Sequence, residues 1–330
     1  MTKLLTIEQL NIGADILKNG GLVAFPTETV YGLGANALDE NAVKKIFEAK
    51  GRPADNPLIV HISDYEILNE LVTEIPEKAK LLMEKFWPGP LTIILNKTDK
   101  VPDIVSGGLN TVAVRMPKNP VALELIKTSK VPVAAPSANT SGKPSPTKAQ
   151  YVVDDMYGKI DAIIDGGNCE VGLESTVLDM SGTTPKLLRP GGVTFEQLTE
   201  VLGEISKKFE CNDNEKPASP GMKYKHYSPD AKVVVVKNDF ENYINKCCEK
   251  YENVAVICYG DIKINKKCKL KKVVNSSLEY ANVLFSAMRD FDKQHPDIIL
   301  AQDVDDTGIN LAIKNRLYRC CGYNFYEKSN

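Results

Sequence analysis

Long apolar runs, a secretory signal and a large excess of one charge are all missing from this chain. No apolar stretch approaches the ~18 residues that span a bilayer, and the N-terminal segment, Met-Thr-Lys-Leu-Leu-Thr-Ile-Glu-Gln-Leu, lacks the charged-then-apolar pattern of a signal peptide. The 41 Lys and Arg residues against 43 Asp and Glu residues leave a net charge of −2, which does not favour a strongly electrostatic nucleic-acid binder. We therefore expect a cytoplasmic globular protein, and 330 residues are enough for two domains.

Histidine is scarce, and the cysteines are poorly spaced for metal binding. The three histidines, His61, His226 and His295, stand far apart, and the eight cysteines include no Cys-x-x-Cys pair. Structural zinc sites need such closely spaced ligands. We therefore expect no metal site, and we expect the cysteines to be reduced, structural thiols.

Several familiar catalytic motifs are also absent. The chain has no Gly-x-x-x-x-Gly-Lys-Ser/Thr, no His-Glu-x-x-His, no Gly-x-Ser-x-Gly and no spaced carboxylate cluster that could cage a metal. These absences exclude a P-loop enzyme and leave no support for a zinc peptidase or a hydrolase with a nucleophile elbow.

Residues 1–204 alternate strand-like and helix-like segments, which predicts one α/β domain with a largely mixed sheet. Strands are expected at 21–25, 58–62, 91–95, 112–116, 131–135, 162–164, 176–179 and 186–188. Helices are expected at 40–49, 76–86, 119–129, 147–155 and 194–203.

A second alternation of strands and helices begins at residue 231. Strands are expected at 232–236, 254–258 and 298–301, and helices at 239–250, 277–291 and 308–320. One face of the helix over 277–291 is expected to carry Leu278, Ala281, Phe285 and Met288. This spacing predicts a smaller, Rossmann-like parallel α/β domain over 231–330. No Gly-x-Gly-x-x-Gly follows its first strand, so dinucleotide binding there has no support.

The segment between the two domains, residues 205–230, is polar and contains three prolines, which predicts an extended linker. Its second half is unusual for a spacer, because Met222, Tyr224, His226 and Tyr227 are side chains that prefer to contact other groups. We expect residues 218–229 to fold over the active site when substrates are bound.

Five segments rich in hydroxyl, amide and glycine residues lie at predicted strand ends of the first domain, at 26–29, 106–111, 134–142, 172–176 and 188–192. Ligands bind at such strand ends in α/β sheets, and a helix N-terminus adds free N–H groups for an anion. One such segment alone is more often a simple turn. Five of them in one domain predict a binding site.

Four cations accompany these segments. Lys50 and Arg52 lie on a loop that prolines stiffen, while Arg115 and Arg189 lie at the ends of predicted strands. Taken singly, Lys50 and Arg52 could be solvated loop charges. With the five segments, the four cations indicate a site that holds an anion.

The remaining titratable residues nearby point away from acid–base chemistry. His61 could be a satisfied strand histidine as readily as a ligand, and Glu28 and Glu174 are single carboxylates, which rarely signal catalysis. A site rich in cations but poor in bases suits a nucleophile that is already an anion, such as a carboxylate or carbamate that attacks a nucleotide phosphate.

Several motifs together resemble the YrdC/Sua5 family. In the first domain they are Pro-Thr-Glu-Thr-Val-Tyr-Gly-Leu at 26–33, Lys-Gly-Arg-Pro at 50–53 with Asn-Pro-Leu at 56–58, Trp-Pro-Gly-Pro-Leu-Thr at 87–92, Arg-Met-Pro at 115–117 and Ala-Pro-Ser-Ala-Asn at 135–139. The second half resembles the Sua5-type members, with Ser-Pro-Gly-Met-Lys-Tyr-Lys-His-Tyr-Ser-Pro at 219–229, Gly308, and Ala-Ile-Lys-Asn-Arg-Leu at 312–317. The match runs in order along nearly the whole chain.

The resemblance implies a twisted mixed-sheet catalytic domain with a concave basic site, followed by a Rossmann-like domain. It also implies a nucleotidyltransferase that makes L-threonylcarbamoyladenylate and pyrophosphate from L-threonine, bicarbonate and ATP. This product is the first intermediate of the t6A37 modification of tRNA, and downstream threonylcarbamoyl-transfer proteins would receive it. Mg²⁺ would arrive with ATP.

Site roles are carried over only at matching positions. The resemblance places L-threonine on Thr29, His61, Arg115, Ala135 and Ser175. It places ATP on Arg52, Asn56, Thr111, Ser137, Ser145 and Arg189, with His226 or Tyr227 closing over the nucleotide. Lys50 and Arg52 would screen the reacting phosphates.

Two other functions compete with this one. An RNA-binding module is possible for the first domain, but a chain of net charge −2 without aromatic stacking repeats is a poor candidate. A carbamoyltransferase of the hydrogenase-maturation type resembles the first domain as well, but its zinc-finger cysteine pairs and acylphosphatase-like region are absent here.

Overall fold

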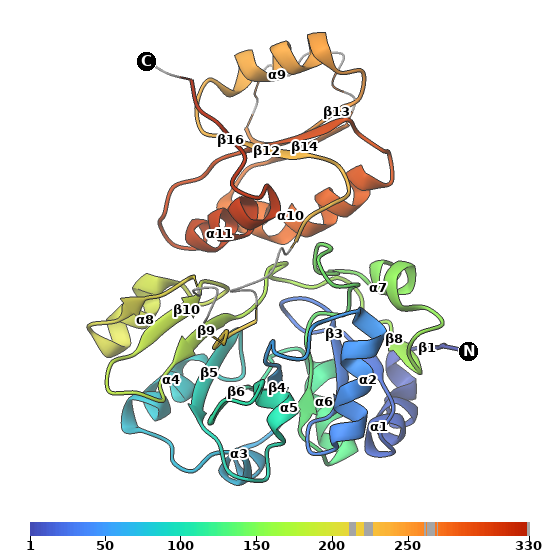
Figure 1. Cartoon of the computed structure of the whole chain (residues 1–330), viewed down its shortest axis with the longest axis vertical. Coiled ribbons are helices and arrows are strands. Elements are labelled where there is room, and N and C mark those ends of the chain that lie inside the picture. The colour runs from blue at the N-terminus through green and yellow to red at the C-terminus, as the bar shows by residue number, and fades with distance from the viewer. Residues whose placement is uncertain (211–215, 221–226, 261, 263–267, 269, 329–330) are drawn as a thin grey trace. The chain divides into compact units, whose positions relative to one another are not determined.

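The computed structural model describes residues 1–210, 216–220, 227–260, 262, 268 and 270–328 (Figure 1). Internal contacts divide the chain into two units, Met1–Ser141 with Ser145–Tyr224, and Gly142–Pro144 with Lys225–Asn330. The division after Tyr224 falls within the predicted linker over 205–230.

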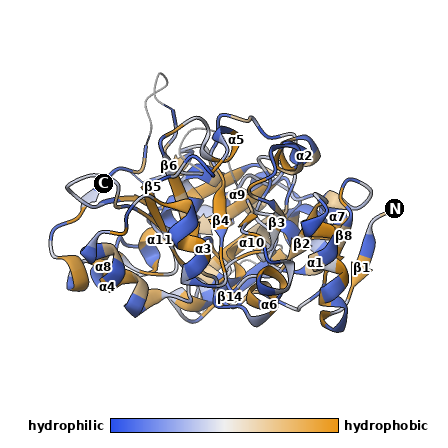
Figure 2. Ribbon diagram, turned by 90° about the horizontal axis from the view of Figure 1, so that it is seen from below, coloured by the Kyte–Doolittle hydropathy of each residue, from blue (hydrophilic) through white to orange (hydrophobic). Residues whose placement is uncertain are grey.

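The first unit contains one large sheet whose central strands are mostly hydrophobic (Figure 2). In spatial order its strands are β1 (Lys3–Leu5), β8 (Ala162–Ile164), β2 (Val23–Phe25), β3 (Gly32–Asn36), β7 (Val133–Ala134), β4 (Ile59–His61), β6 (Thr111–Arg115), β5 (Leu91–Asn96), β9 (Thr176–Asp179), β10 (Lys186–Arg189) and β11 (Ser206–Lys207). Parallel pairs such as β4–β6 and β5–β9 alternate with antiparallel pairs such as β5–β6. The predicted mixed α/β sheet is confirmed.

The helices of this unit include five that lie within two residues of their predicted ranges and three, at 10–18, 65–71 and 103–106, that were not predicted. They are α1 (Leu10–Lys18), α2 (Glu40–Lys50), α3 (Tyr65–Leu71), α4 (Glu77–Phe86), α5 (Asp103–Ser106), α6 (Pro120–Ser129), α7 (Ala149–Met156) and α8 (Phe195–Leu202), with a short 3₁₀ turn at Ile7–Gln9. The Asp39 side chain accepts hydrogen bonds from the first turn of α2, and Gly51 ends it in the left-handed conformation. Helix α2 therefore includes Lys50, one residue beyond the predicted end.

Helices α1 and α6 pack together over the β2, β7 and β8 part of the sheet. Leu17 and Leu125 meet Phe25 and Val133 in this core cluster. The packing fixes the strand ends from which the loop after β2 departs, and that loop carries part of the candidate site.

The second unit contains a parallel sheet of β14 (Leu270–Val274), β13 (Val254–Tyr259), β15 (Ile298–Gln302), β12 (Val233–Val236) and β16 (Phe325–Tyr326), in that order. Its helices are α9 (Phe240–Lys250), α10 (Ser277–Asp292) and α11 (Asn310–Cys320). The predicted parallel α/β domain is confirmed. Its core includes four buried cysteines, Cys247, Cys248, Cys258 and Cys268.

Two details differ from the prediction. Leu278, in the first turn of α10, is 73% exposed, whereas Ala281, Phe285 and Met288 on the same helical face are buried. Residues 206 and 207 do not belong to a free spacer, because they form β11 and pair in parallel with β10. Among the described residues, no helix is long and apolar enough to cross a membrane.

Candidate active site

Side chains of two neighbouring strands, β4 and β6, point to one face of the large sheet. His61 on β4 pairs with Arg115 on β6, so their side chains share a face. Residues two apart on a strand also share a face, which adds Thr111 to Arg115. Three residues predicted to bind substrate therefore lie on the same face.

A small apolar cluster occupies the middle of this face. It consists of Ile59, Ile94, Ala113, Val177 and Leu188, one residue from each of β4, β5, β6, β9 and β10. Ala218, from the predicted linker, packs against the cluster. The linker segment over 216–220 therefore reaches the face that carries Arg115.

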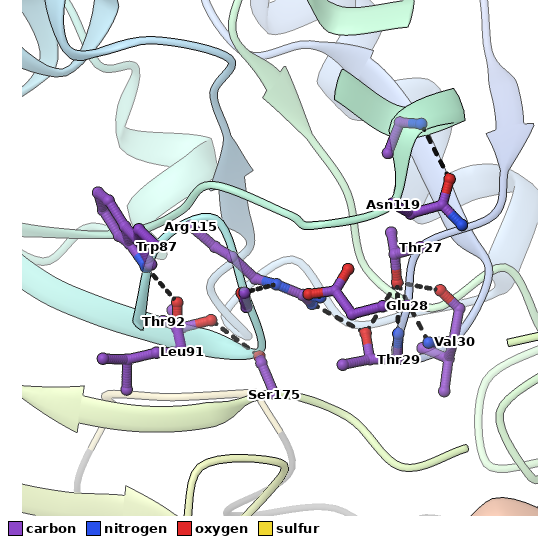
Figure 3. A network of polar contacts seen from close by, with 12 residues as sticks. Thr27, Glu28, Thr29, Val30, Trp87, Leu91, Thr92, Arg115, Asn119 and Ser175 are labelled. Carbon is purple, nitrogen blue, oxygen red and sulfur yellow. Dashed lines mark hydrogen bonds and ion pairs between the residues drawn. The ribbon is translucent and has the colours of Figure 1, made fainter. Parts of the chain in front are cut away.

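Arg115 is 3% exposed and is held on three sides (Figure 3). Its Nε donates to the carbonyl oxygen of Gly89 at 3.2 Å, and its Nη1 donates to Thr29 Oγ1 at 2.9 Å. Its Nη2 lies 2.7 Å from Glu28 Oε1 as an ion pair, but these atoms are not aligned for a hydrogen bond. Because a guanidinium has five N–H groups, donors remain for a substrate carboxylate.

The loop after β2 is shaped by Thr27. Its hydroxyl donates to the Val30 carbonyl at 2.6 Å and accepts from the backbone N–H groups of Thr29 and Val30, each at 3.2 Å. Such a hydroxyl-closed turn fixes the residues inside it. The turn presents Glu28 and Thr29 together to Arg115, as Figure 3 shows.

His61 is buried beside this group and stays neutral at physiological pH. Burial, followed by the positive charge of Arg115, lowers the pKa of His61 to about 3. Its Nδ1 lies 3.2 Å from the Ile59 carbonyl oxygen, which suits a proton on Nδ1. His61 can therefore offer a polar contact, but it is a weak base.

Ser175 and Arg189 are brought together at the start of β9 and the end of β10. Arg189 donates through Nε to the Ser175 carbonyl at 3.0 Å and through Nη2 to Ser175 Oγ at 3.1 Å. Thr92 Oγ1 lies 2.8 Å from Ser175 Oγ. A residue predicted to contact threonine thus touches one predicted to contact the nucleotide.

Lys50 corrects one prediction. It is 2% exposed, and its ammonium donates to the carbonyl oxygens of Ser137 and Asn139, both at 2.5 Å. The sequence suggested an exposed loop cation, but Lys50 ends α2 and is covered there. Its charge is therefore fixed behind the segment that contains Ser137.

Arg52 lies on the loop after α2, as predicted, and curls back onto it. Its Nη2 donates to the carbonyl oxygens of Asn56 at 3.3 Å and Pro57 at 3.2 Å. Asn56 is 2% exposed, and its Oδ1 has no hydrogen-bond partner among the described residues. Because a buried polar atom favours a partner, this loop offers an unfilled acceptor.

Ser145 forms a further buried pair with Glu174, whose Oε1 accepts from the Ser145 hydroxyl at 2.5 Å. Ala135 donates its backbone N–H to Ile59 at 2.9 Å, and Ser137 forms a backbone bridge with Gly32. The sequence analysis named Ser145, Ala135 and Ser137 as site residues, but it treated Glu174 as an isolated carboxylate.

Of the two residues predicted to close over the nucleotide, the structure describes Tyr227. His226 lies outside the described residues. Tyr227 belongs to the second unit, where its ring stacks on Phe285 at 5.3 Å and lies 5.5 Å from Arg316 Cζ. These contacts account for the burial of Tyr227 within that unit.

Sequence reasoning missed the roles of Glu28 and Thr27. Both are buried, at 2% exposed, and both hold residues that it did name. No local signal pointed to this burial, because glutamate and threonine are mostly exposed and glutamate is buried only when it is paired. Among the described residues, no group of three or more His, Cys, Asp or Glu side chains could hold a metal ion.

Comparisons with known proteins show which family the chain belongs to. Residues 15–191 match the family described as "Telomere recombination", and residues 193–322 match the family described as "Threonylcarbamoyl-AMP synthase, C-terminal domain". The threonylcarbamoyl-AMP synthase of Pyrococcus abyssi is 50% identical over 97% of this chain and 96% of its own length, and that of Bacillus subtilis is 47% identical over 95% and 93%.

A solved structure extends the comparison to the fold. The crystal structure of P. abyssi Sua5 complexed with L-threonine matches 98% of both chains with a TM-score of 0.92 at 48% identity. The two family matches together cover both units, and the relatives match over nearly their full length. Both findings give the same family assignment. The chain belongs to the YrdC/Sua5 family of threonylcarbamoyl-AMP synthases.

Proposed function

We propose that this chain joins L-threonine, bicarbonate and ATP into L-threonylcarbamoyladenylate and pyrophosphate, for the t6A37 modification of tRNA. Its membership of the synthase family and the L-threonine held by P. abyssi Sua5 support this function. The observation that carries it is Arg115, a buried cation with unused donors beside the Thr29 hydroxyl.

Arg115 binds the threonine carboxylate through the N–H groups that the protein leaves unused. Thr29, His61 and Ser175 offer polar atoms to the threonine hydroxyl and amino groups, and Ala135 packs against the threonine methyl group. A substrate hydroxyl that meets buried polar atoms is selected strongly, because an analogue without it leaves those atoms unpaired.

The nucleotide occupies the remaining predicted residues, Arg52, Asn56, Thr111, Ser137, Ser145 and Arg189, with His226 or Tyr227 over it. The carbamate oxygen of threonine attacks the α-phosphorus of ATP, and the bond to pyrophosphate breaks. Lys50, Arg52 and Arg189 screen the charge that the phosphates bring together. Mg²⁺ would arrive on the triphosphate.

The proposed setting is the cytoplasm, where the product passes to proteins that transfer the threonylcarbamoyl group to tRNA. A carbamate-derived adenylate hydrolyses readily, so shielding it from water before transfer favours a high yield.

Pyrophosphate release tests the proposal. The full chain is incubated with ATP, Mg²⁺, bicarbonate and each amino acid in turn. We expect release with threonine, and we expect it to depend on bicarbonate. Release that is equal with and without threonine would contradict the proposed function.

A further inference from the structure

Glu28 carries a buried carboxylate oxygen with nothing to bind. Its side chain is 3% exposed and lies 2.7 Å from Arg115 through Oε1, and neither of its oxygens accepts a hydrogen bond in the described part of the chain. A buried carboxylate oxygen without a donor is costly, because it has lost its water without replacement. The site therefore holds an acceptor that a ligand can fill.

Arg115, the ion-pair partner of Glu28, has a donor that lacks an acceptor in the described part of the chain. Arg115 Nη2 makes no aligned hydrogen bond with any described residue. A donor and an acceptor that form an ion pair but no aligned hydrogen bond thus lie side by side, on a guanidinium and a carboxylate. A free amino acid carries the opposite arrangement, a carboxylate next to an ammonium group.

We propose that Glu28 accepts the ammonium group of the threonine substrate and takes its proton before the amine attacks bicarbonate. The inference rests on the proposed function, since it assumes that threonine places its carboxylate on Arg115. Glu28 then acts as a catalytic base in the first half of the reaction, which the cations cannot promote.

The atoms and charges of this step balance. An N–H bond of the ammonium breaks and an O–H bond forms on Glu28, leaving a neutral amine. The amine nitrogen bonds to the bicarbonate carbon, and a bicarbonate oxygen leaves as water after taking a second proton from nitrogen. The products are the threonine carbamate anion, water and protonated Glu28.

The other titratable groups near Glu28 suit this role poorly. His61 has its pKa lowered to about 3 by burial and by Arg115, so it does not compete for the proton. Burial, and then the charge of Glu28, raises the pKa of the Cys169 thiol well above its usual range.

The unmodified chain provides the first test. Calorimetry compares the binding of threonine with that of 3-hydroxybutanoate, which has the carboxylate and the hydroxyl but no amino group. We expect threonine to bind at least about tenfold more tightly, the scale of one charge-assisted hydrogen bond. Equal affinities would overturn the proposal without any variant being made.

The Glu28→Gln variant distinguishes two roles of Glu28, which are binding the ammonium group of threonine and orienting Arg115. We expect it to weaken threonine binding about tenfold or more while changing 3-hydroxybutanoate binding about twofold at most. If Glu28 only orients Arg115, both ligands lose affinity equally, and the proposal fails. Glu170→Gln, which changes an exposed carboxylate nearby, is the control and should alter neither affinity.

The pH profile tests the proton transfer. In Glu28→Gln the free amine must come from solution, so pyrophosphate release should rise roughly tenfold per pH unit where threonine is mostly protonated. The unmodified chain should show a flatter profile, and identical profiles would overturn the base role. If Glu28→Gln does not fold, Glu28→Asp provides the same comparison. Aspartate keeps the negative charge, but its shorter side chain holds the carboxylate farther from the ammonium group.

Different results would contradict the proposed function and the proposed role of Glu28. An unmodified chain that releases no pyrophosphate contradicts the proposed function, whatever its ligand affinities. A chain that releases pyrophosphate normally but binds 3-hydroxybutanoate as tightly as threonine contradicts only the role of Glu28.

Discussion

Arg115 on β6 donates a 2.9 Å hydrogen bond to Thr29, which lies 86 positions earlier in the loop after β2. Strands β3, β7 and β4 separate β2 from β6 in the sheet. The loop therefore reaches across the sheet to Arg115, and the site depends on this long-range contact.

Arg115→Lys should raise the KM for threonine and lower kcat/KM about a hundredfold. Lysine keeps the charge but cannot pair two N–H groups with a carboxylate or hold Gly89, Thr29 and Glu28 at once. Pyrophosphate release at varied threonine concentration measures the change. Arg319→Lys, in α11 of the second unit, is the control, and an Arg115→Lys variant with unchanged KM would contradict carboxylate binding by Arg115.

Threonine should support pyrophosphate release, serine should support less, and valine should support little. Valine fills the volume of threonine but lacks the hydroxyl, and buried Thr29 and Ser175 would lose a partner. The measurement is the initial rate with each amino acid at equal concentration. Equal rates with valine and threonine would show that no polar group selects the hydroxyl.

Arg52→Ala should reduce transition-state stabilisation by about 2–4 kcal/mol, the scale of one preorganised electrostatic contact. Folding should be largely retained, because Arg52 lies on the loop after α2 and its Nη2 donates to carbonyl oxygens of that same loop. Rates and melting temperature are measured on the same preparation. Near-normal turnover would mean that Arg52 does not act on the phosphates.

Lys50→Ala should lower both activity and stability. The variant leaves the carbonyl oxygens of Ser137 and Asn139 without their buried donor, which costs about 1–3 kcal/mol for each orphaned group. Urea unfolding measures the stability. Lys44→Ala, an exposed position on the same helix, is the control, and equal stability of the two variants would contradict the buried role of Lys50.

Acid should destabilise the protein partly through His61. Its pKa is about 3 when folded and near 6.5 when unfolded, so the unfolded state binds more protons between these values. The free energy of unfolding should fall by up to about 1.4 kcal/mol per pH unit as the pH drops through this window.

His61→Asn should remove that part of the pH dependence. Urea unfolding at pH 7 and pH 4.5 gives the comparison, and the variant should lose less stability than the unmodified chain. The control is His295→Asn, since His295 is exposed and asparagine tolerates its positive φ of 47°. A His61→Asn variant with an unchanged slope would contradict the buried, neutral state of His61.

Ala218→Glu should slow pyrophosphate release without unfolding the first unit. A carboxylate at this position cannot pack against Ile59, Ile94 and Ala113, so the segment would leave the face that carries Arg115. Lys216→Glu introduces the same group at an exposed neighbour and should have a smaller effect. Equal rates for the two variants would show that docking of Ala218 does not matter.

Local signals in the sequence determined many of the helices and strands. The Asp39 cap and Gly51 set the ends of α2, and β8 and β9 have the predicted bounds, because caps, left-handed glycines and short apolar runs act within a few residues. The motifs also identified the family, because their residues and their order can be recognised in the sequence without knowledge of the fold. The candidate substrate-binding residues were named from those motifs.

Only the tertiary structure decided which of those residues meet. Strand β3, Gly32–Asn36, escaped prediction because glycine has low strand propensity, yet a Cβ on Gly34 would lie 2.7 Å from Val133 and 2.8 Å from Phe25, so close packing requires glycine there. The burial of Lys50 and the pairing of Glu28 with Arg115 depend on carbonyls and strands far away in the chain. Burial and charge pairing are set by such distant neighbours, which local sequence patterns do not encode.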